Sequence, residues 1–414
     1  MTQEIHIEQF DNGLMLLAEP MPWLESAAFT FLVPAGCSRD PRGRSGLAGF
    51  TCEMVQRGAG TRDSRQFIED LEMLGVDGSA SVSNAHTSFS GAMPAENLEE
   101  TLSIYADVVL RPHLDEEEFE DSRLVCLQEV RALEDDFAQK VMLELRRRRY
   151  PDPYGRSSQG TEESLHAIEM DDIRRFFPAF YQPRGFILGV AGKLDWPRLR
   201  QRVAQLFGGW RPAPPPEIIE TPITGGYHHI PHETSQTHIG VAYPSVSYAD
   251  EDYFQARGAV GILSDGMSSR LFTEIREKRG LCYSVYASCH SLQDRGSVVC
   301  YAGTTTDRAQ ETLDVLLHEL VRLSSGIEPD ELHRLKARIK SVLIMQQESS
   351  MSRSGAIASD WYFLRRARTL EEIGRIVDGL TQDSINRYLA SHPPQDFTVV
   401  TLGDKQLETA LAVP

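Results

Sequence analysis

The chain has 414 residues, of which 41% are hydrophobic and 25% are charged, and this composition is typical of about two to three globular domains. Its formal net charge is −18. This charge argues against a nucleic-acid partner, because neutralising phosphates requires clustered lysine and arginine. No stretch approaches the ~18–20 consecutive apolar residues of a membrane-spanning helix, so we expect no membrane segment.

The N-terminal stretch and the cysteines both bear on the cellular compartment of the protein. The first residues, "MTQEIHIEQFDNGLML", lack the basic and then apolar regions of a signal peptide. The six cysteines show no C-x-x-C spacing, which favours free thiols over a disulfide frame or a zinc ribbon. They are Cys37, Cys52, Cys126, Cys282, Cys289 and Cys300. We therefore expect a cytoplasmic protein.

The first half predicts strands and helices in a definite order. Residues 26–36 (SAAFTFLVPAG) form an apolar run suited to a strand, and a helix is expected over 46–55. Residues 74–82 (LGVDGSASV) read as a helix end that turns into a strand through glycine. Residues 96–110 carry leucines at the spacing of an amphipathic helix, and a further helix begins within 114–123.

A proline-rich segment at 211–226 follows this first half. It holds four prolines within five residues, which neither continue a helix nor fit a central strand. These prolines are Pro212, Pro214, Pro215 and Pro216. The segment therefore predicts an extended linker between two domains, at 1–210 and 227–414.

The second half repeats the pattern of the first. Residues 237–245 again form an apolar run, and 279–287 (RGLCYSVYA) align with 74–82. Residues 308–323 form a second amphipathic leucine pattern, and a helix begins within 327–336. The sequence therefore predicts an α+β fold of two homologous domains, each a mixed sheet with helices on one face, that face each other as a clamshell. A substrate cleft is expected between them.

The stretch "PAGCSRDPRGRSGLAGFTCEMVQRGAGTRDS" at 34–64 resembles the N-terminal signature of the insulinase/pitrilysin family of zinc peptidases. This family includes the mitochondrial processing peptidases. Its signature contains the motif H-x-x-E-H, in which two histidines one helical turn apart bind zinc and the glutamate is the general base. The resemblance covers nearly the whole chain and implies the fold described above.

Carried onto this chain, the family motif has lost its ligands. The first histidine position is Gly49, the base position is Cys52 and the second histidine position is Glu53. The third ligand of the family, a glutamate, matches Glu129. Because zinc needs at least three protein ligands to be catalytic, we expect no zinc site in this chain and no hydrolysis of peptides by the chain alone.

The C-terminal half keeps a different part of the family pattern. The stretch "DGMSSRLFTEIREKRGLCYSVYASC" at 265–289 resembles the family closely. In the family, an arginine and a tyrosine from this stretch reach the bound peptide near zinc, and they match Arg276 and Tyr283. A phenolic hydroxyl can stabilise an oxyanion, and a guanidinium can hold a carbonyl or carboxylate. The alternative is an arginine on a solvated helix face and a tyrosine that packs in the core.

A second retained feature is the segment "SVSNAHTSFSG" at 81–91. In the family, an edge strand with a similar segment pairs with the substrate backbone, and Asn84 and Ala85 match it. His86 alone is not expected to bind a metal.

The resemblance implies a division of labour, because some members of this family work as pairs. In such pairs one subunit supplies zinc and base, and the other supplies the arginine and tyrosine. We therefore expect the non-metal subunit of a heterodimeric zinc peptidase, with a homologous zinc-bearing subunit as partner and an unfolded peptide as substrate.

Two alternatives remain open at this point. The first is a non-enzymatic scaffold or peptide-binding protein of the same fold, forming a homodimer. The second is a peptidase that binds metal through Cys52, Glu53 and Glu129. Co-purification distinguishes the first alternative, and metal analysis of the purified chain distinguishes the second.

Overall fold

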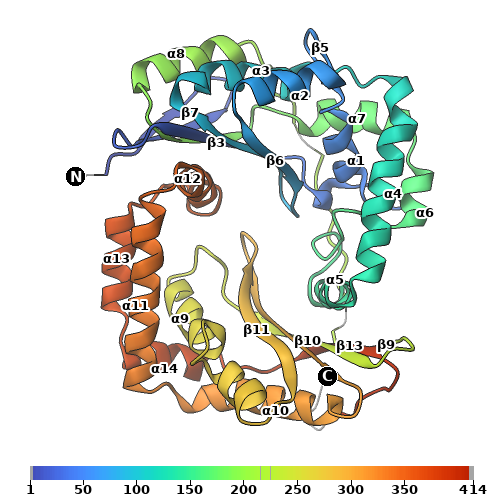
Figure 1. Ribbon diagram of the computed structural model, residues 1–414, viewed down its shortest axis with the longest axis vertical. Coiled ribbons are helices and arrows are strands. Elements are labelled where there is room, and N and C mark those ends of the chain that lie inside the picture. The colour runs from blue at the N-terminus through green and yellow to red at the C-terminus, as the bar shows by residue number, and fades with distance from the viewer. Residues whose placement is uncertain (1–2, 215, 224, 410–414) are drawn as a thin grey trace. The chain divides into compact units, whose positions relative to one another are not determined.

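The computed structural model describes residues 3–214, 216–223 and 225–409 (Figure 1). The chain forms two compact units. The first comprises Met1–Ala132, Arg156–Glu220 and Ile344–Leu370, and the second comprises Leu133–Gly155, Thr221–Leu343 and Glu371–Pro414, each within the described residues. Across those residues, none of the helices combines the length and the apolar character needed to cross a membrane.

The first unit is built on a six-stranded sheet in the order β1-β2-β8-β3-β7-β6. Strands β2 and β8 run parallel, and the other neighbours run antiparallel. The strands are β1 His6–Gln9, β2 Met15–Pro20, β3 Ser26–Val33, β6 Asp77–Val82, β7 Thr87–Pro94 and β8 Ile187–Gly192, with a separate two-stranded ribbon of β4 Gly58–Ala59 and β5 Arg62–Asp63.

The helices that belong wholly or mainly to the first unit come from three parts of the chain. They are η1 Cys37–Arg39, α1 Leu47–Met54, α2 Ser64–Met73, η2 Ala95–Asn97, α3 Leu98–Leu110, η3 Glu116–Glu118, α4 Phe119–Asp135, α6 Glu162–Ala167, α7 Met170–Phe180, α8 Trp196–Phe207 and α12 Ser350–Leu364.

The second unit is built on a five-stranded sheet in the order β11-β12-β10-β13-β9, in which only β13 and β9 run parallel among the described strands. Its elements are α5 Phe137–Arg149, β9 Tyr227–Pro231, β10 Gln236–Ser245, α9 Tyr253–Ser264, the π-helix η4 Phe272–Glu277, β11 Cys282–Ser291, β12 Gly296–Thr305, α10 Ala309–Arg322, η5 Leu323–Ser325, α11 Pro329–Gln346, α13 Leu370–Gly379, α14 Gln382–Ser391 and β13 Thr398–Gly403.

Each sheet is covered by helices on both faces. Since side chains alternate along a strand, neighbouring residues of one strand enter different cores. In β2, Leu16 and Ala18 enter the main core of the first unit, whereas Met15 and Leu17 pack with Ile357 of α12. In the second unit, α5 has the same role. Its Val141 and Leu145 pack with Ala242, Val299, Val400 and Leu402 of the sheet, and the other helices cover the opposite face.

The two compact units do not coincide with the predicted domains at 1–210 and 227–414, because one helix from each half of the sequence belongs to the other unit. Helix α5 lies within the first half of the sequence but packs on β10 and β13 of the second unit. Helix α12 lies within the second half but packs on β2, β3 and β8 of the first unit (Figure 1). Periodicity along the sequence does not reveal this exchange, since a helix pattern does not say which sheet it covers.

The predicted fold class is confirmed, with a mixed sheet and its helices in each unit. The aligned segments 74–82 and 279–287 lead into β6 and β11, and each of these strands is an edge of its sheet. The described residues of the predicted linker at 211–226 contain no helix or strand, apart from a bridge between Thr221 and Asp152.

Candidate functional site

The first helix of the candidate site, α1, is fixed at its N-terminus by a buried carboxylate. Gly46 precedes the helix with a φ of 90°, a conformation that favours glycine. Asp40 accepts hydrogen bonds from the backbone N–H groups of Gly46 at 2.7 Å and Ala48 at 2.9 Å. Burial raises the pKa of the Asp40 carboxyl to about 7, although these hydrogen bonds favour its charged form.

Gly49, the predicted first histidine position, has no room for a side chain. A Cβ atom built on Gly49 would lie 2.7 Å from the backbone oxygen of Ser158. Side chains essentially never approach a backbone oxygen so closely. The position therefore has neither a metal donor nor the space for one.

Cys52, at the predicted base position, is a buried thiol. It is 5% exposed, and its pKa is raised far above its ordinary value by burial and by the nearby charge of Glu53. A thiol in this state carries no charge near neutral pH, so it does not serve as a general base.

Glu53 and Glu129 are both present, but neither is poised as a ligand. The carboxylate of Glu53 is engaged by the guanidinium of Arg57, whose Nε lies 2.8 Å away, one helical turn along α1. Glu129 lies on α4 with its side chain exposed, and partial desolvation together with repulsion from Glu53 raises its pKa. Within residues 3–214, 216–223 and 225–409, no group of three or more His, Cys, Asp and Glu side chains is placed to hold a metal ion. The residues at this site do not fit a zinc ion.

Arg276 and Tyr283 of the second unit form a different kind of arrangement. The guanidinium carbon of Arg276 lies 4.9 Å from the ring centroid of Phe272 and 4.8 Å from that of Tyr283, so the cation is stacked against both rings. The side chain of Tyr283 is 83% exposed. Cys282 of β11 pairs with Thr304 of β12, and Ser284 pairs with the adjacent Gly303. Tyr283 therefore has no partner of its own and is the extra residue of a β-bulge.

The local backbone explains these orientations. Arg276 lies in a π-helical turn, where the N–H of Lys278 donates to the carbonyl of Thr273 at 2.9 Å, and such turns occur often at functional sites. Gly280, with a φ of 60°, follows the turn and ends it. The bulge interrupts the regular alternation of side chains along β11 at Tyr283, whose ring is exposed to solvent.

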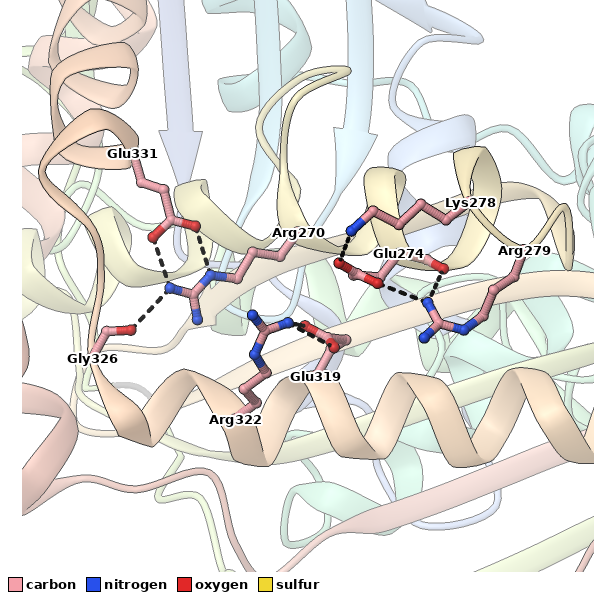
Figure 2. Close-up of polar contacts among 8 residues, drawn as sticks. All are labelled: Arg270, Glu274, Lys278, Arg279, Glu319, Arg322, Gly326 and Glu331. Carbon is pink, nitrogen blue, oxygen red and sulfur yellow. Dashed lines mark hydrogen bonds and ion pairs between the residues drawn. The ribbon is translucent and has the colours of Figure 1, made fainter.

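The cations around Arg276 are paired, whereas Arg276 is not. Figure 2 shows neighbouring arginine and lysine side chains directed at carboxylates. The pairs are Arg270 with Glu331, and both Lys278 and Arg279 with Glu274, at 2.7 Å in each case. Among the residues that the structure describes, the guanidinium of Arg276 makes no ion pair or hydrogen bond, and neither does the hydroxyl of Tyr283. Their polar groups are therefore available to a ligand.

Asn84 and Ala85 lie in the turn between β6 and β7 rather than in a strand. The carbonyl of Asn84 accepts a hydrogen bond from the N–H of Ser38 at 3.0 Å, which ties the turn to η1. The edge strand itself is β6, which among the described strands pairs with β7 alone, so its outer edge is open to a further strand. His86 is buried against the ring of Tyr362 at 4.3 Å, and burial lowers its pKa to about 4.

Sequence reasoning missed several residues that determine these arrangements. Phe272 lies four residues before Arg276, and Arg57 lies four residues after Glu53, so i,i+4 spacing was the signal for both. Ser158 carried no such signal, because it lies about a hundred residues away from α1 in the chain.

Among the described residues, the structure therefore combines two sheet-and-helix units with a helix, α1, that carries no set of metal ligands. A family model described as "Insulinase (Peptidase family M16)" matches residues 18–162, and one described as "Peptidase M16 inactive domain" matches residues 167–339. The chain belongs to the M16, or insulinase, family, and it is a protease-like member with an inactive-type M16 domain.

Relatives and solved structures extend over almost the full length of the chain. An uncharacterized zinc protease of Rickettsia bellii is 27% identical over 91% of this chain and 92% of its own, and the uncharacterized zinc protease YmxG of Bacillus subtilis is 25% identical over 94% and 96%. A crystal structure described as a peptidase M16 inactive domain from Pseudomonas fluorescens has a TM-score of 0.89 at 22% identity and covers 99% of this chain and 100% of its own. A protease from Helicobacter pylori also has a TM-score of 0.89, at 20% identity, and covers 97% and 100%. These structures support the fold.

Proposed function

We propose that this protein is the non-metal subunit of a heterodimeric zinc peptidase. It binds an unfolded peptide and supplies Arg276 and Tyr283 to the zinc site of a homologous partner subunit. The observation that carries the proposal is the contrast between two sites of one chain. The α1 site offers no set of metal ligands, whereas the Arg276–Tyr283 site presents an unpaired guanidinium and an exposed phenol.

The chemistry of the pair suits peptide hydrolysis. When water attacks a peptide bond, the carbonyl oxygen becomes negatively charged, and a phenolic O–H directed at it lowers the barrier. The guanidinium of Arg276, which has no carboxylate of its own, can hold a second carbonyl or a carboxylate of the peptide. In this proposal zinc and the general base come from the partner.

Peptide binding by the first unit is the second part of the proposal. The outer edge of β6 can accept the backbone of an extended peptide as an additional strand, and Asn84 and Ala85 follow directly at its end. The proposal places the complex in the cytoplasm. This placement is supported by the six cysteines, which are all free thiols in the structure.

The test mixes this chain with a zinc-bearing M16 homologue from the same organism and measures cleavage of an unfolded peptide, with and without a chelator. We expect cleavage only with both chains and zinc. Tyr283→Phe is expected to lower kcat by roughly 10²-fold or more, the effect of removing one oxyanion donor.

Tyr286→Phe is the matched control, because Tyr286 lies on the same strand and its ring packs against Tyr301 at 5.4 Å. It is expected to retain nearly full activity. Unchanged turnover in Tyr283→Phe rejects the catalytic role. A stable homodimer that neither pairs with the zinc-bearing chain nor supports cleavage favours the scaffold alternative.

A further inference from the structure

The face of α1 that carries Gly49 is covered by a segment of the same chain, residues 156–160. A Cβ atom on Gly49 would meet the oxygen of Ser158 at 2.7 Å, and one on Gly46 would meet the oxygen of Gln159 at 2.7 Å. From the other side, a Cβ on Gly160 would meet the oxygen of Ser45 at 2.2 Å. Glycine at all three positions allows two stretches of backbone to lie in direct contact.

The segment is held at both ends. At its beginning, the guanidinium of Arg156 donates to the carbonyl oxygen of Asp40, and the thiol of Cys37 donates to the carbonyl of Arg156 at 3.7 Å. Just beyond its end, the hydroxyl of Ser164 donates to the carbonyl of Ser45 at 2.7 Å. The contact with α1 is therefore accompanied by hydrogen bonds at both ends of the segment.

This contact lies where the missing histidine would project. Positions 49 and 53 are four residues apart, so their side chains leave α1 on the same face, one turn from each other. The backbone of Ser158 fills the space over position 49, and the Arg57 ion pair engages the carboxylate at position 53.

We propose that the former metal face of α1 has become an internal docking site for residues 156–160, so that restoring the motif side chains does not restore zinc binding. In this proposal, the absence of zinc binding rests on backbone packing over position 49 as well as on the identity of the side chains. This inference does not depend on a partner subunit, because it concerns only contacts within the first unit.

The first test compares two helical glycines. Within a helix, alanine is ordinarily more favourable than glycine. A Cβ at Gly374 in α13 would meet no atom within 4 Å, so Gly374→Ala is expected to keep or raise the melting temperature of the full chain. Gly49→Ala is expected to lower it by several degrees. If Gly49→Ala is as stable as wild type or more stable, the docking site is rejected.

The second test measures metal content. The triple variant Gly49→His, Cys52→Glu, Glu53→His carries the complete motif, and after dialysis against zinc we expect far less than one zinc per chain by mass spectrometry. The double variant Cys52→Glu, Glu53→His is its control for folding. One tightly held zinc per folded triple variant overturns the proposal. If the triple variant does not fold while the double variant does, the clash at position 49 is supported, and the alanine comparison decides the matter on its own.

Discussion

Because the guanidinium of Arg276 stacks on the rings of Phe272 and Tyr283, its position depends on planar contact with aromatic rings rather than on a carboxylate. A stacked arginine keeps its hydrogen-bond donors free at its edge, where a peptide carbonyl can reach them. Lysine carries the same charge but has neither the plane nor the fork of donors.

Arg276→Lys therefore tests whether activity requires the planar, forked guanidinium of Arg276 or only its positive charge. In the paired enzyme of the proposed function, we expect kcat/KM to fall about tenfold, which corresponds to ~1.4 kcal/mol, within the range of a cation–π contact. Arg279→Lys is the control, since Arg279 is already paired with Glu274. Equal activity of the two variants would show that only the charge at position 276 is used.

Two elements of the first unit, α1 and the segment that covers it, depend on one buried acid. Asp40 accepts from two N–H groups at the start of α1, and its backbone carbonyl accepts from Arg156. Its folded-state pKa of about 7 lies above its ordinary value of 3.8. Between about pH 4 and pH 7 the folded protein therefore binds more protons than the unfolded chain, so the free energy of unfolding falls as the pH rises.

Asp40→Asn removes this titration. We expect the free energy of unfolding of wild type, measured by denaturant titration relative to the variant, to fall from pH 4 to pH 7. The change should be on the order of a few kcal/mol, at ~1.4 kcal/mol per unit of pKa shift. The same slope in both proteins would contradict a protonated Asp40 in the fold.

Local patterns predicted many of the elements well. The amphipathic spacing at 96–110 and 308–323 corresponds to α3 Leu98–Leu110 and α10 Ala309–Arg322, and the apolar run at 237–245 corresponds to β10. The Glu274–Lys278 ion pair, at 2.7 Å, likewise follows from i,i+4 spacing. These features depend on neighbours within one or two turns.

Features that depend on distant parts of the chain were not predictable in the same way. The bulge that exposes Tyr283 arises from the register with β12, and the space over Gly49 is filled by Ser158. The packing of α5 on the second unit and of α12 on the first unit also depends on distant parts of the chain. In each case the sequence specifies the element, and the identity of its partner follows only from the folded chain.

Across the whole molecule, α12 is held in the first unit by a buried ion pair. The Nε of Arg353 donates to Glu19 of β2 at 2.9 Å, and the two residues are 1% and 2% exposed. Ser354 of the same helix lies 3.0 Å from the hydroxyl of Thr30 in β3. Removing one member of a buried pair leaves the other charge without compensation.

Arg353→Met is therefore expected to lower the free energy of unfolding of the full chain by about 3–5 kcal/mol, measured by denaturant titration. Replacing both partners, as Arg353→Met with Glu19→Gln, should recover part of this loss. The control is Glu25→Gln, which breaks an exposed pair with Lys193 and should cost less than ~1 kcal/mol. A loss at Arg353 no larger than at Glu25 would show that the buried pair does not hold α12.

The exchange of covering helices also affects folding during synthesis and the stability of fragments of the chain. While the ribosome has released only the first 210 residues, Met15, Leu17 and Ile187 have no Ile357 to pack against, and Val141 and Leu145 of α5 have no sheet. Cleavage of the polypeptide at the proline-rich segment would leave both fragments with a bare apolar surface of this kind. Although the sequence reads as a tandem duplication, each half lacks the helix that covers the second face of its own sheet, so both halves are needed to bury both faces of either sheet.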